Sequence, residues 1–354
     1  MKPCRTKRTW LVLIGMVLSL GLIGGYLTLL NSLRTDDGIV ICGHRYSSTL
    51  RDLYDEVSML YKKPIRVIKK REIPDHLTSC FREDMTNALY THDKDIWLLL
   101  QEQPSEDVIA HELMHAVLRT EGYPELWSVG ISPLGQKLAV IVAGFLDHLV
   151  INGRLLEIGY DARAGFLSRA DGPENILKLD VPDELPKRIV LYFVLLHELA
   201  KFRHYIGDIR AEEALLAKFP EVAPYWETLS FQIRNLPQRP KPHDLWDIGV
   251  AFIQMGDRMC TDAKVDVLIS DIVGLNSAAL DNNDMSRPAK DIFTQTTEPV
   301  GSQQVVVRIF LVEPRVMVSC VVVPRGSPML KAAEVLSVRD YLLRLNVEFI
   351  SKNK

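Results

Sequence analysis

The sequence predicts an α+β protein that is mainly helical, with one N-terminal transmembrane helix and a small β-hairpin plus helix at its C-terminus. Three observations carry this prediction: an uncharged apolar run follows a basic N-terminus, most later apolar residues recur at helical spacing, and β-branched runs gather near the C-terminus. Hydrophobic residues make up 47% and charged residues 25% of the 354 residues, as in folded proteins. The net charge of −3 provides no basic excess, so we expect no nucleic-acid partner.

The N-terminus predicts an uncleaved membrane anchor. Residues 1–9 form a basic tail, and residues 10–30 are apolar and uncharged. At about 1.5 Å per residue, a helix over 10–30 is about 30 Å long, which matches the hydrocarbon core of a bilayer. No small-residue cleavage site is evident at its end, although cleavage as a signal peptide stays an alternative. The basic tail should remain cytoplasmic, which makes this a single-pass protein whose remaining chain is extracytoplasmic.

An extracytoplasmic location would permit disulfides among the cysteines beyond the span. Two bonds could form, and the sequence does not choose among their connectivities; buried free thiols are the alternative. The residues concerned are Cys42, Cys80, Cys260 and Cys320.

Beyond the anchor we expect a linker over 31–46, a main domain over 47–275, a loop or linker over 276–301 and a C-terminal segment over 302–354. Apolar spacing, caps and breakers predict the elements. The predicted helices are 47–61 with Ser48 as its cap, 106–120, 138–151, 183–206, 212–219, 244–272 and 330–345. The predicted strands are 64–69, 96–100, 304–312 and 316–323; residues 153–158 continue a helix or begin another, and 220–242 is irregular.

The predicted helix over 106–120 contains His111-Glu112-Leu113-Met114-His115, an H-E-x-x-H motif. Residues four apart lie on one face of a helix, so His111 and His115 can present two imidazoles to one metal ion. Imidazole is a good zinc ligand, and Glu112 is placed to take a proton from a water molecule that the metal activates. We therefore expect one Zn²⁺ per chain, with Glu112 as the catalytic base. Two solvent-facing histidines on an amphipathic helix, without metal, are the alternative.

A catalytic zinc site needs a third protein ligand. Asp147 and His148 lie within an apolar run, where burial of polar groups is costly unless they are paired or bind metal. We expect Asp147 to be the third ligand, with His148 as the alternative or as a supporting or transition-state group. A self-satisfied Asp–His pair in the core stays open, and Glu157 is a weaker candidate ligand.

A second stretch, His197-Glu198-Leu199-Ala200-Lys201, imitates the motif but ends in lysine. His197 and His204 share a helix face about two turns apart, too far apart to chelate one ion together. We expect both to be surface or rim residues; a position lining the cleft is the alternative for one of them.

The motif and its surroundings resemble a known family. Residues 96–124, a strand followed by the H-E-x-x-H helix, resemble the core of gluzincin-type zinc metallopeptidases, and together with 146–155 they resemble uncharacterised bacterial metallopeptidases. The resemblance implies a zincin-like catalytic core, zinc on His111 and His115, and Glu112 as general base. A gluzincin takes its third ligand as a glutamate from a downstream helix, whereas this chain offers Asp147 or His148 there.

These observations predict a membrane-anchored zinc peptidase that hydrolyses peptide or protein substrates. Tyr123, His148 and Tyr160 are candidates to stabilise the oxyanion. Two other hypotheses remain: an inactive zincin-like module that binds a partner at the membrane, and a metal-dependent amidase that acts on an envelope substrate. An intact Glu112 favours an enzyme over a binding module, since binding alone needs no base.

Overall fold

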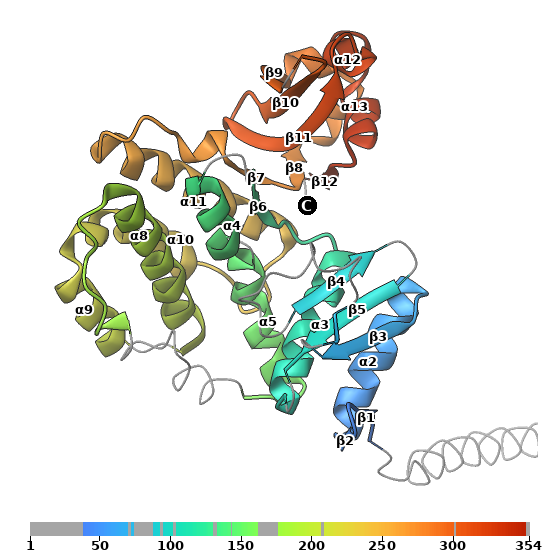
Figure 1. Ribbon diagram of the computed structural model, residues 1–354, viewed down its shortest axis with the longest axis vertical. Helices are drawn as coiled ribbons and strands as arrows, with labels where there is room; N and C mark the ends of the chain where they lie inside the picture. Colours follow the sequence, from blue (N-terminus) through green and yellow to red (C-terminus); the bar gives the residue numbers. More distant parts are fainter. Residues whose placement is uncertain are drawn as a thin grey trace, which may run out of the picture. The chain divides into compact units, whose positions relative to one another are not determined.

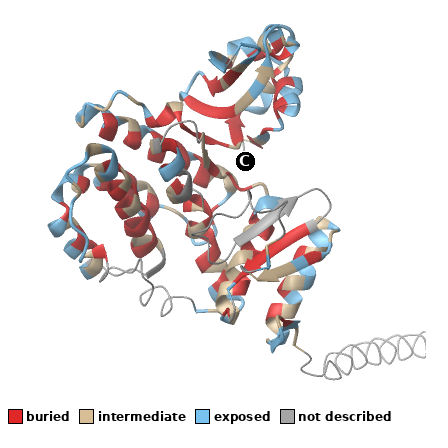
Figure 2. Ribbon diagram, viewed as in Figure 1, coloured by how far each residue is buried: buried red, intermediate tan, exposed pale blue. Residues whose placement is uncertain are grey.

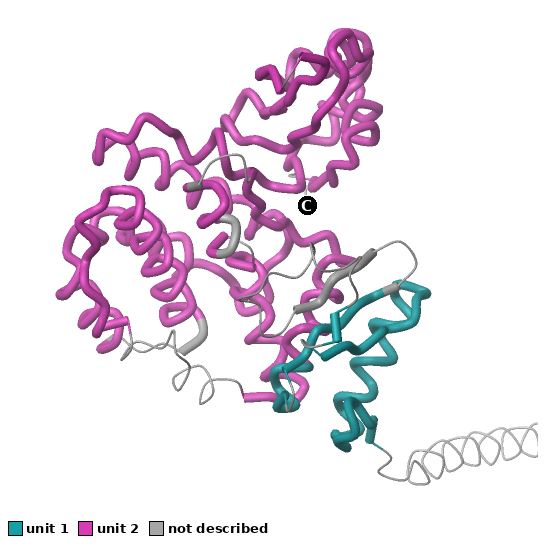
Figure 3. The backbone as a smooth tube through the Cα atoms, in the orientation of Figure 1, with its two compact units in different colours: residues 1–109 teal, residues 110–354 magenta. Residues whose placement is uncertain are grey.

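The computed structural model describes residues 38–69, 72–73, 88–92, 95–101, 104–129, 133–142, 144–161, 176–206, 209–300 and 302–351. The chain divides into two compact units, residues 1–109 and 110–354, and the boundary falls inside helix α3, Glu106–Thr120 (Figure 3). The predicted membrane anchor, 10–30, and its basic tail lie outside the described residues. Among the described helices, none is both long and apolar enough to span a membrane.

Unit 1 contains a three-stranded sheet in the order β3-β5-β4. Its central strand β5 (Asp95–Leu100) pairs parallel with β3 (Ile65–Lys69) and antiparallel with β4 (Ala88–His92). Residues 96–100 of β5 are all buried, as expected for a continuous apolar strand. The predicted strands over 64–69 and 96–100 are therefore confirmed.

Helix α2 (Ser48–Tyr61) lies beside β3, and the Tyr54 hydroxyl donates a hydrogen bond to the Ile65 carbonyl at 2.9 Å (Figure 1). The helix is confirmed, but its cap is Ser47 and not Ser48, because the Ser47 side chain accepts from the Leu50 backbone N–H. The predicted linker over 31–46 is described only from residue 38. There it holds a two-stranded antiparallel ladder of β1 (Val40–Ile41) and β2 (His44–Arg45).

Unit 2 is built mainly from helices. Helix α8 packs against α4, α5, α10 and α11, so most of its surface is buried (Figure 2). The helices are α4 Pro133–Val142, α5 Phe145–Glu157, α8 Leu185–Lys201, α9 Ile209–Lys218, α10 Ala223–Arg234, α11 Pro242–Asp262, α12 Ala332–Val335 and α13 Val338–Leu345. A π-helical turn, η3 (Phe202–Ile206), follows α8, and short 3₁₀ turns are η4 Pro220–Val222, η5 Ile269–Asp271, η6 Asn282–Ser286, η7 Ala289–Asp291 and η8 Pro328–Lys331.

Several predicted helices need correction. The single core helix expected over 138–151 is two helices, because the chain turns at Gly144, whose φ of 75° is left-handed; α5 then continues past residue 153 and ends at Glu157. The region 220–242, expected to be irregular, contains α10, since its proline lies in the first turn, where no N–H is needed. Helix α11 ends at Asp262, well before the predicted 272.

The C-terminal part of unit 2 carries a five-stranded sheet in the order β6-β7-β11-β10-β9. The predicted hairpin is confirmed as β10 (Gln304–Leu311) paired antiparallel with β11 (Val316–Pro324). The other strands of this sheet are β6 Leu126–Ser128, β7 Val273–Leu275 and β9 Phe293–Val300.

The segment 276–301 is not a loop or linker, because it contains β8 (Ser277–Leu280) and β9. Strand β8 pairs in parallel with β12 (Glu348–Ser351), which the sequence analysis did not predict. The helix expected over 330–345 is interrupted, so that only α12 and α13 are α-helical. The described cysteines, Cys42, Cys260 and Cys320, carry free thiols, and Cys80 lies outside the described residues.

Candidate metal centre

Helix α3 presents the H-E-x-x-H motif within the predicted bounds. Acidic residues occupy its first turn and Arg119 its last, and both placements stabilise the helix through its dipole. The chain leaves the helix at Gly122, whose φ is 75°. Leu113, Ala116 and Val117 are buried, while the motif histidines are half-buried. The two rings lie one turn apart, with centroids separated by 5.1 Å.

Helix α5 brings His148 to this pair. The His111 and His148 Nε2 atoms are 3.1 Å apart, and the His148 ring centroid is 5.0 Å from that of His111 and 5.5 Å from that of His115. Gly144 makes this approach possible. A Cβ atom at this position would lie 3.3 Å from His148 Cε1, which is tight, and 3.5 Å from His115 Cε1, which is ordinary contact, so a side chain here would press on the His148 ring.

The three histidines form a group that fits a metal ion. One ligand nitrogen from each of His111, His115 and His148 lies within 4.8 Å of the other two. Two nitrogens bound to one tetrahedral zinc at about 2.0–2.1 Å are about 3.3 Å apart, close to the distance between the His111 and His148 nitrogens. All three residues are half-buried, so each keeps some exposure to solvent. Three protein ligands with an open position are typical of catalytic zinc sites.

Asp147 contacts the group through His115. Its Oδ2 lies 2.7 Å from His115 Nδ1, so the other nitrogen of that ring, Nε2, is left for a metal. Burial favours neutral His115, but the hydrogen bond and charge of Asp147, with the charge of Glu112, outweigh burial and raise the His115 pKa. Within the described part of the chain, the other carboxylate oxygen of Asp147, Oδ1, has no hydrogen-bond partner.

Of the two candidates for the third ligand, the structure places His148 in the group and Asp147 behind His115. The weaker candidate, Glu157, is roughly two and a half turns further along α5 than His148 and accepts a hydrogen bond from Arg239 at 2.7 Å. The structure therefore does not bring Glu157 to the histidines.

His197 lies beside the histidine group, where the sequence did not predict it to be. It is buried and not at the surface, because helices surround α8 on several sides. Its Nε2 lies 3.2 Å from His148 Nδ1, the two rings stack with centroids 5.4 Å apart, and Phe145 packs against its edge. Burial, followed by the charge of Lys201, lowers the pKa of both His148 and His197 well below the ordinary value. His204 is half-buried, and burial lowers its pKa as well.

Lys201 and Glu198 form a buried ion pair next to His197 on α8. Lys201 Nζ lies 2.7 Å from Glu198 Oε1, and both side chains are less than a tenth exposed. Charged residues within an apolar helix are costly to bury unless they are paired. This rule selected Asp147 as a candidate ligand in the sequence analysis. The same rule, applied to the apolar helix over 183–206, is the signal that could have found His197, Glu198 and Lys201.

The remaining predicted residues have distinct surroundings. Glu112 is half-buried on α3, and its charge acts on His115. Tyr123 was a candidate to stabilise an oxyanion, but its hydroxyl donates to the Pro240 carbonyl at 2.7 Å and is therefore engaged elsewhere. Tyr160 lies beyond the end of α5, more than three turns of chain after His148.

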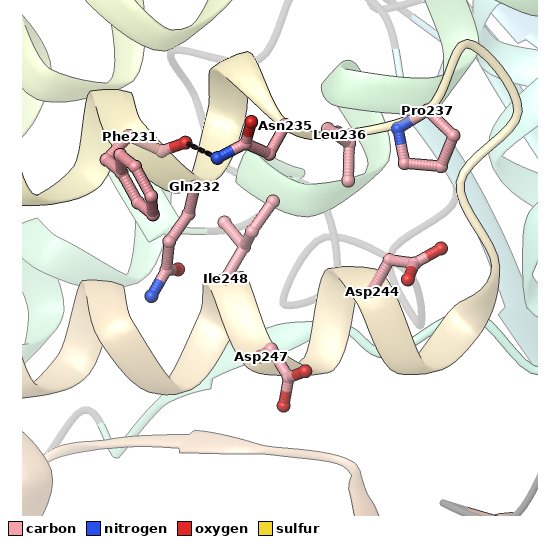
Figure 4. Close-up of a pocket in the computed structure, with 8 residues that line it drawn as sticks. All are labelled: Phe231, Gln232, Asn235, Leu236, Pro237, Asp244, Asp247 and Ile248. Carbon is pink, nitrogen blue, oxygen red and sulfur yellow. Dashed lines mark hydrogen bonds between the residues drawn. The ribbon is translucent and has the colours of Figure 1, made fainter.

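A hollow of about 270 Å³ lies between α10 and α11, at a different place from the histidine group (Figure 4). Its acidic residue Asp244 caps α11, because its carboxylate accepts from the Lys241 backbone N–H at 2.7 Å. Asn235 donates to the Phe231 carbonyl at 2.9 Å. These contacts serve the local helices, so we assign no chemistry to this hollow.

In comparisons with known proteins, no family model, no curated protein and no solved structure matches the chain.

Proposed function

We propose that the chain is a zinc-dependent peptidase, attached to the membrane by the helix predicted over 10–30. The observation that carries the proposal is the convergence of His111, His115 and His148, with Glu112 beside His111 on the same helix. Three imidazole nitrogens suit zinc, and an open position suits catalysis. His148 and not Asp147 is the third ligand in this proposal, since Asp147 already holds the ring of His115.

In this proposal, the zinc ion would lower the pKa of a water molecule and polarise the substrate carbonyl. Glu112 takes a proton from that water molecule while the oxygen of the water bonds to the carbonyl carbon. Glu112 then gives the proton to the departing amine nitrogen as the C–N bond breaks, and it returns to a carboxylate. Asp147 keeps the His115 ring oriented throughout, because it accepts a hydrogen bond from the nitrogen that does not face the metal.

The first experiment measures metal by mass spectrometry in the purified full chain and in the variant His115→Ala. About one zinc per chain, lost in the variant, is the expected result. A wild-type chain that binds no metal under zinc-replete conditions contradicts the proposed metal centre.

The second experiment separates an enzyme from a binding module. Glu112→Gln should abolish hydrolysis of a peptide library while zinc content stays at the wild-type level, because glutamine cannot take the proton. Equal hydrolysis by Glu112→Gln would contradict the role of this residue. Zinc binding without peptide cleavage by the wild-type chain would contradict the peptidase and direct the search to amide bonds in envelope substrates.

A further inference from the structure

The His148 ring is held at both of its nitrogens. Its Nε2 faces His111, and its Nδ1 lies 3.2 Å from His197 Nε2. His197 also hydrogen-bonds to the backbone carbonyl of Ile141. Ile141, His148 and His197 lie on α4, α5 and α8, and α8 packs against both other helices (Figure 1). Three helices therefore contribute to one line of contacts that ends at the metal centre.

The direction of these contacts follows from the carbonyl. A carbonyl oxygen only accepts hydrogen bonds, so the His197 nitrogen that faces Ile141 carries a proton. Because burial disfavours the charged imidazolium, the other nitrogen, Nε2, keeps its lone pair. That lone pair can accept from His148 Nδ1–H. His148 then has its own lone pair on Nε2, the atom that faces the metal centre.

We propose that His197 is a positioning residue of the metal centre, which holds His148 in the tautomer and orientation that a metal ligand needs. The inference rests on the proposed function, because it assumes that His148 binds the metal. It assigns to α8 a part in a site whose predicted metal ligands and catalytic base all lie on α3 and α5. Asp147 holds His115 in the same way, by a hydrogen bond to the ring nitrogen that does not face the metal. Hydrogen bonds of this kind to the far nitrogen of a histidine ligand stabilise metal binding.

His197 makes two kinds of contact that a replacement can separate: its Nε2 faces His148 Nδ1, and its ring packs against Phe145. A glutamine can present an amide oxygen near the position of His197 Nε2 and still accept from His148. A leucine fills similar space but accepts nothing. The two variants therefore separate a hydrogen-bonding role from a packing role.

The test measures the zinc affinity of the full chain, purified in detergent, by competition with a chromophoric chelator. His197→Leu should lower the affinity by about 10- to 100-fold, and His197→Gln should recover most of that loss. His204→Gln is the matched control, because the half-buried His204 also hydrogen-bonds to a backbone carbonyl on α5, that of Leu149. The zinc affinity of this variant should equal that of the wild type. The melting temperature of each metal-free variant checks that the fold persists.

Unchanged affinity in His197→Leu, or equal losses in His197→Leu and His197→Gln, would overturn the inference and leave the metal centre in place. A wild-type chain that binds no zinc would overturn both this inference and the proposed function. Zinc binding that depends on His197 without any peptide hydrolysis would overturn the peptidase alone.

Discussion

Asp147 and His148 are adjacent in the sequence, yet the structure gives them different places in the proposed metal centre. Asp147→Asn should weaken zinc binding without abolishing it, whereas His148→Ala should leave too few ligands for measurable binding under the same conditions. The reason is geometric: His148 Nε2 faces His111 Nε2 at 3.1 Å, while the Asp147 carboxylate lies 2.7 Å from the far nitrogen of His115.

The size of the first effect follows from the hydrogen bond that the carboxylate makes. A hydrogen bond to a charged group contributes about 1.5–3 kcal/mol and one between neutral groups about 0.5–1.5 kcal/mol. An asparagine in place of Asp147 can still accept from His115 Nδ1–H, so the loss is about 1–1.5 kcal/mol, or roughly tenfold in affinity. Asp147→Ala removes the acceptor altogether and should cost about 10- to 100-fold.

The pH dependence gives this prediction a second readout. Despite burial, Asp147 raises the pKa of His115 above its ordinary value of 6.5, so in the wild type a proton competes with zinc for His115 at higher pH than in Asp147→Asn. The wild type should therefore lose affinity first as the pH falls, and its advantage over the variant should shrink in acid.

Chelator competition from about pH 8 to about pH 6 measures both effects in the full chain. If Asp147→Asn abolishes zinc binding while His148→Ala binds normally, then Asp147 is the ligand and the arrangement argued here is wrong. A constant ratio of affinities across the pH range would refute the coupling between Asp147 and His115.

Three further predictions concern the surroundings of the histidines. Without metal, the folded chain should lose stability as the pH falls below about 6.5, because burial lowers the pKa values of His148 and His197, which then take up protons only when unfolded. His115, whose pKa is raised, is protonated in both states in this range and adds no slope, so urea denaturation should show a loss that approaches about 3 kcal/mol per pH unit, and a net gain would contradict these shifts. Gly144→Ala should destabilise the metal-free chain by about 1–2 kcal/mol, because an alanine is strained at the left-handed φ of this position, and it should also weaken zinc binding by pressing on the His148 ring; a variant as stable as the wild type would count against this backbone geometry. Lys201→Met should destabilise the fold by about 3–5 kcal/mol by leaving the Glu198 carboxylate buried without its ammonium, and adding Glu198→Leu should restore most of the melting temperature; failure of the double variant to recover would show that the pair does more than neutralise itself.

The sequence was most informative where the signals are local. The helix over 106–120 has acidic residues at its start and a glycine beyond its end, and the structure has the same bounds. The His111 and His115 imidazoles could also be predicted to lie together from their spacing alone, because residues four apart are neighbours on a helix. Strand β9, by contrast, is a mostly exposed edge strand with polar residues, so its sequence lacks the apolar pattern of a strand and was predicted to be a loop.

The break between α4 and α5 shows a second limit. Residues 138–151 are apolar on all sides, and such a run carries no periodicity to mark where one helix ends. Gly144 was the only local sign of the turn, and a glycine within a helical pattern is tolerated often enough to be overlooked. The turn matters for the site because α5 begins directly against the rings of His115 and His148.

The cost of burying polar groups connects the sequence to the site most directly. In the sequence, Asp147 and His148 stand out because an apolar run surrounds them, and His197, Glu198 and Lys201 stand out in the same way within α8. Each buried group requires a partner, but a sequence does not say which apolar helices meet. The structure answers that question by packing α5 against α8, where the His148 and His197 rings stack. The two apolar helices each carry a histidine and a buried carboxylate, so the sequence predicts that these polar groups need partners. Only the packing of the helices decides which partners they find: Asp147 meets His115 of the H-E-x-x-H motif, and His197 meets His148.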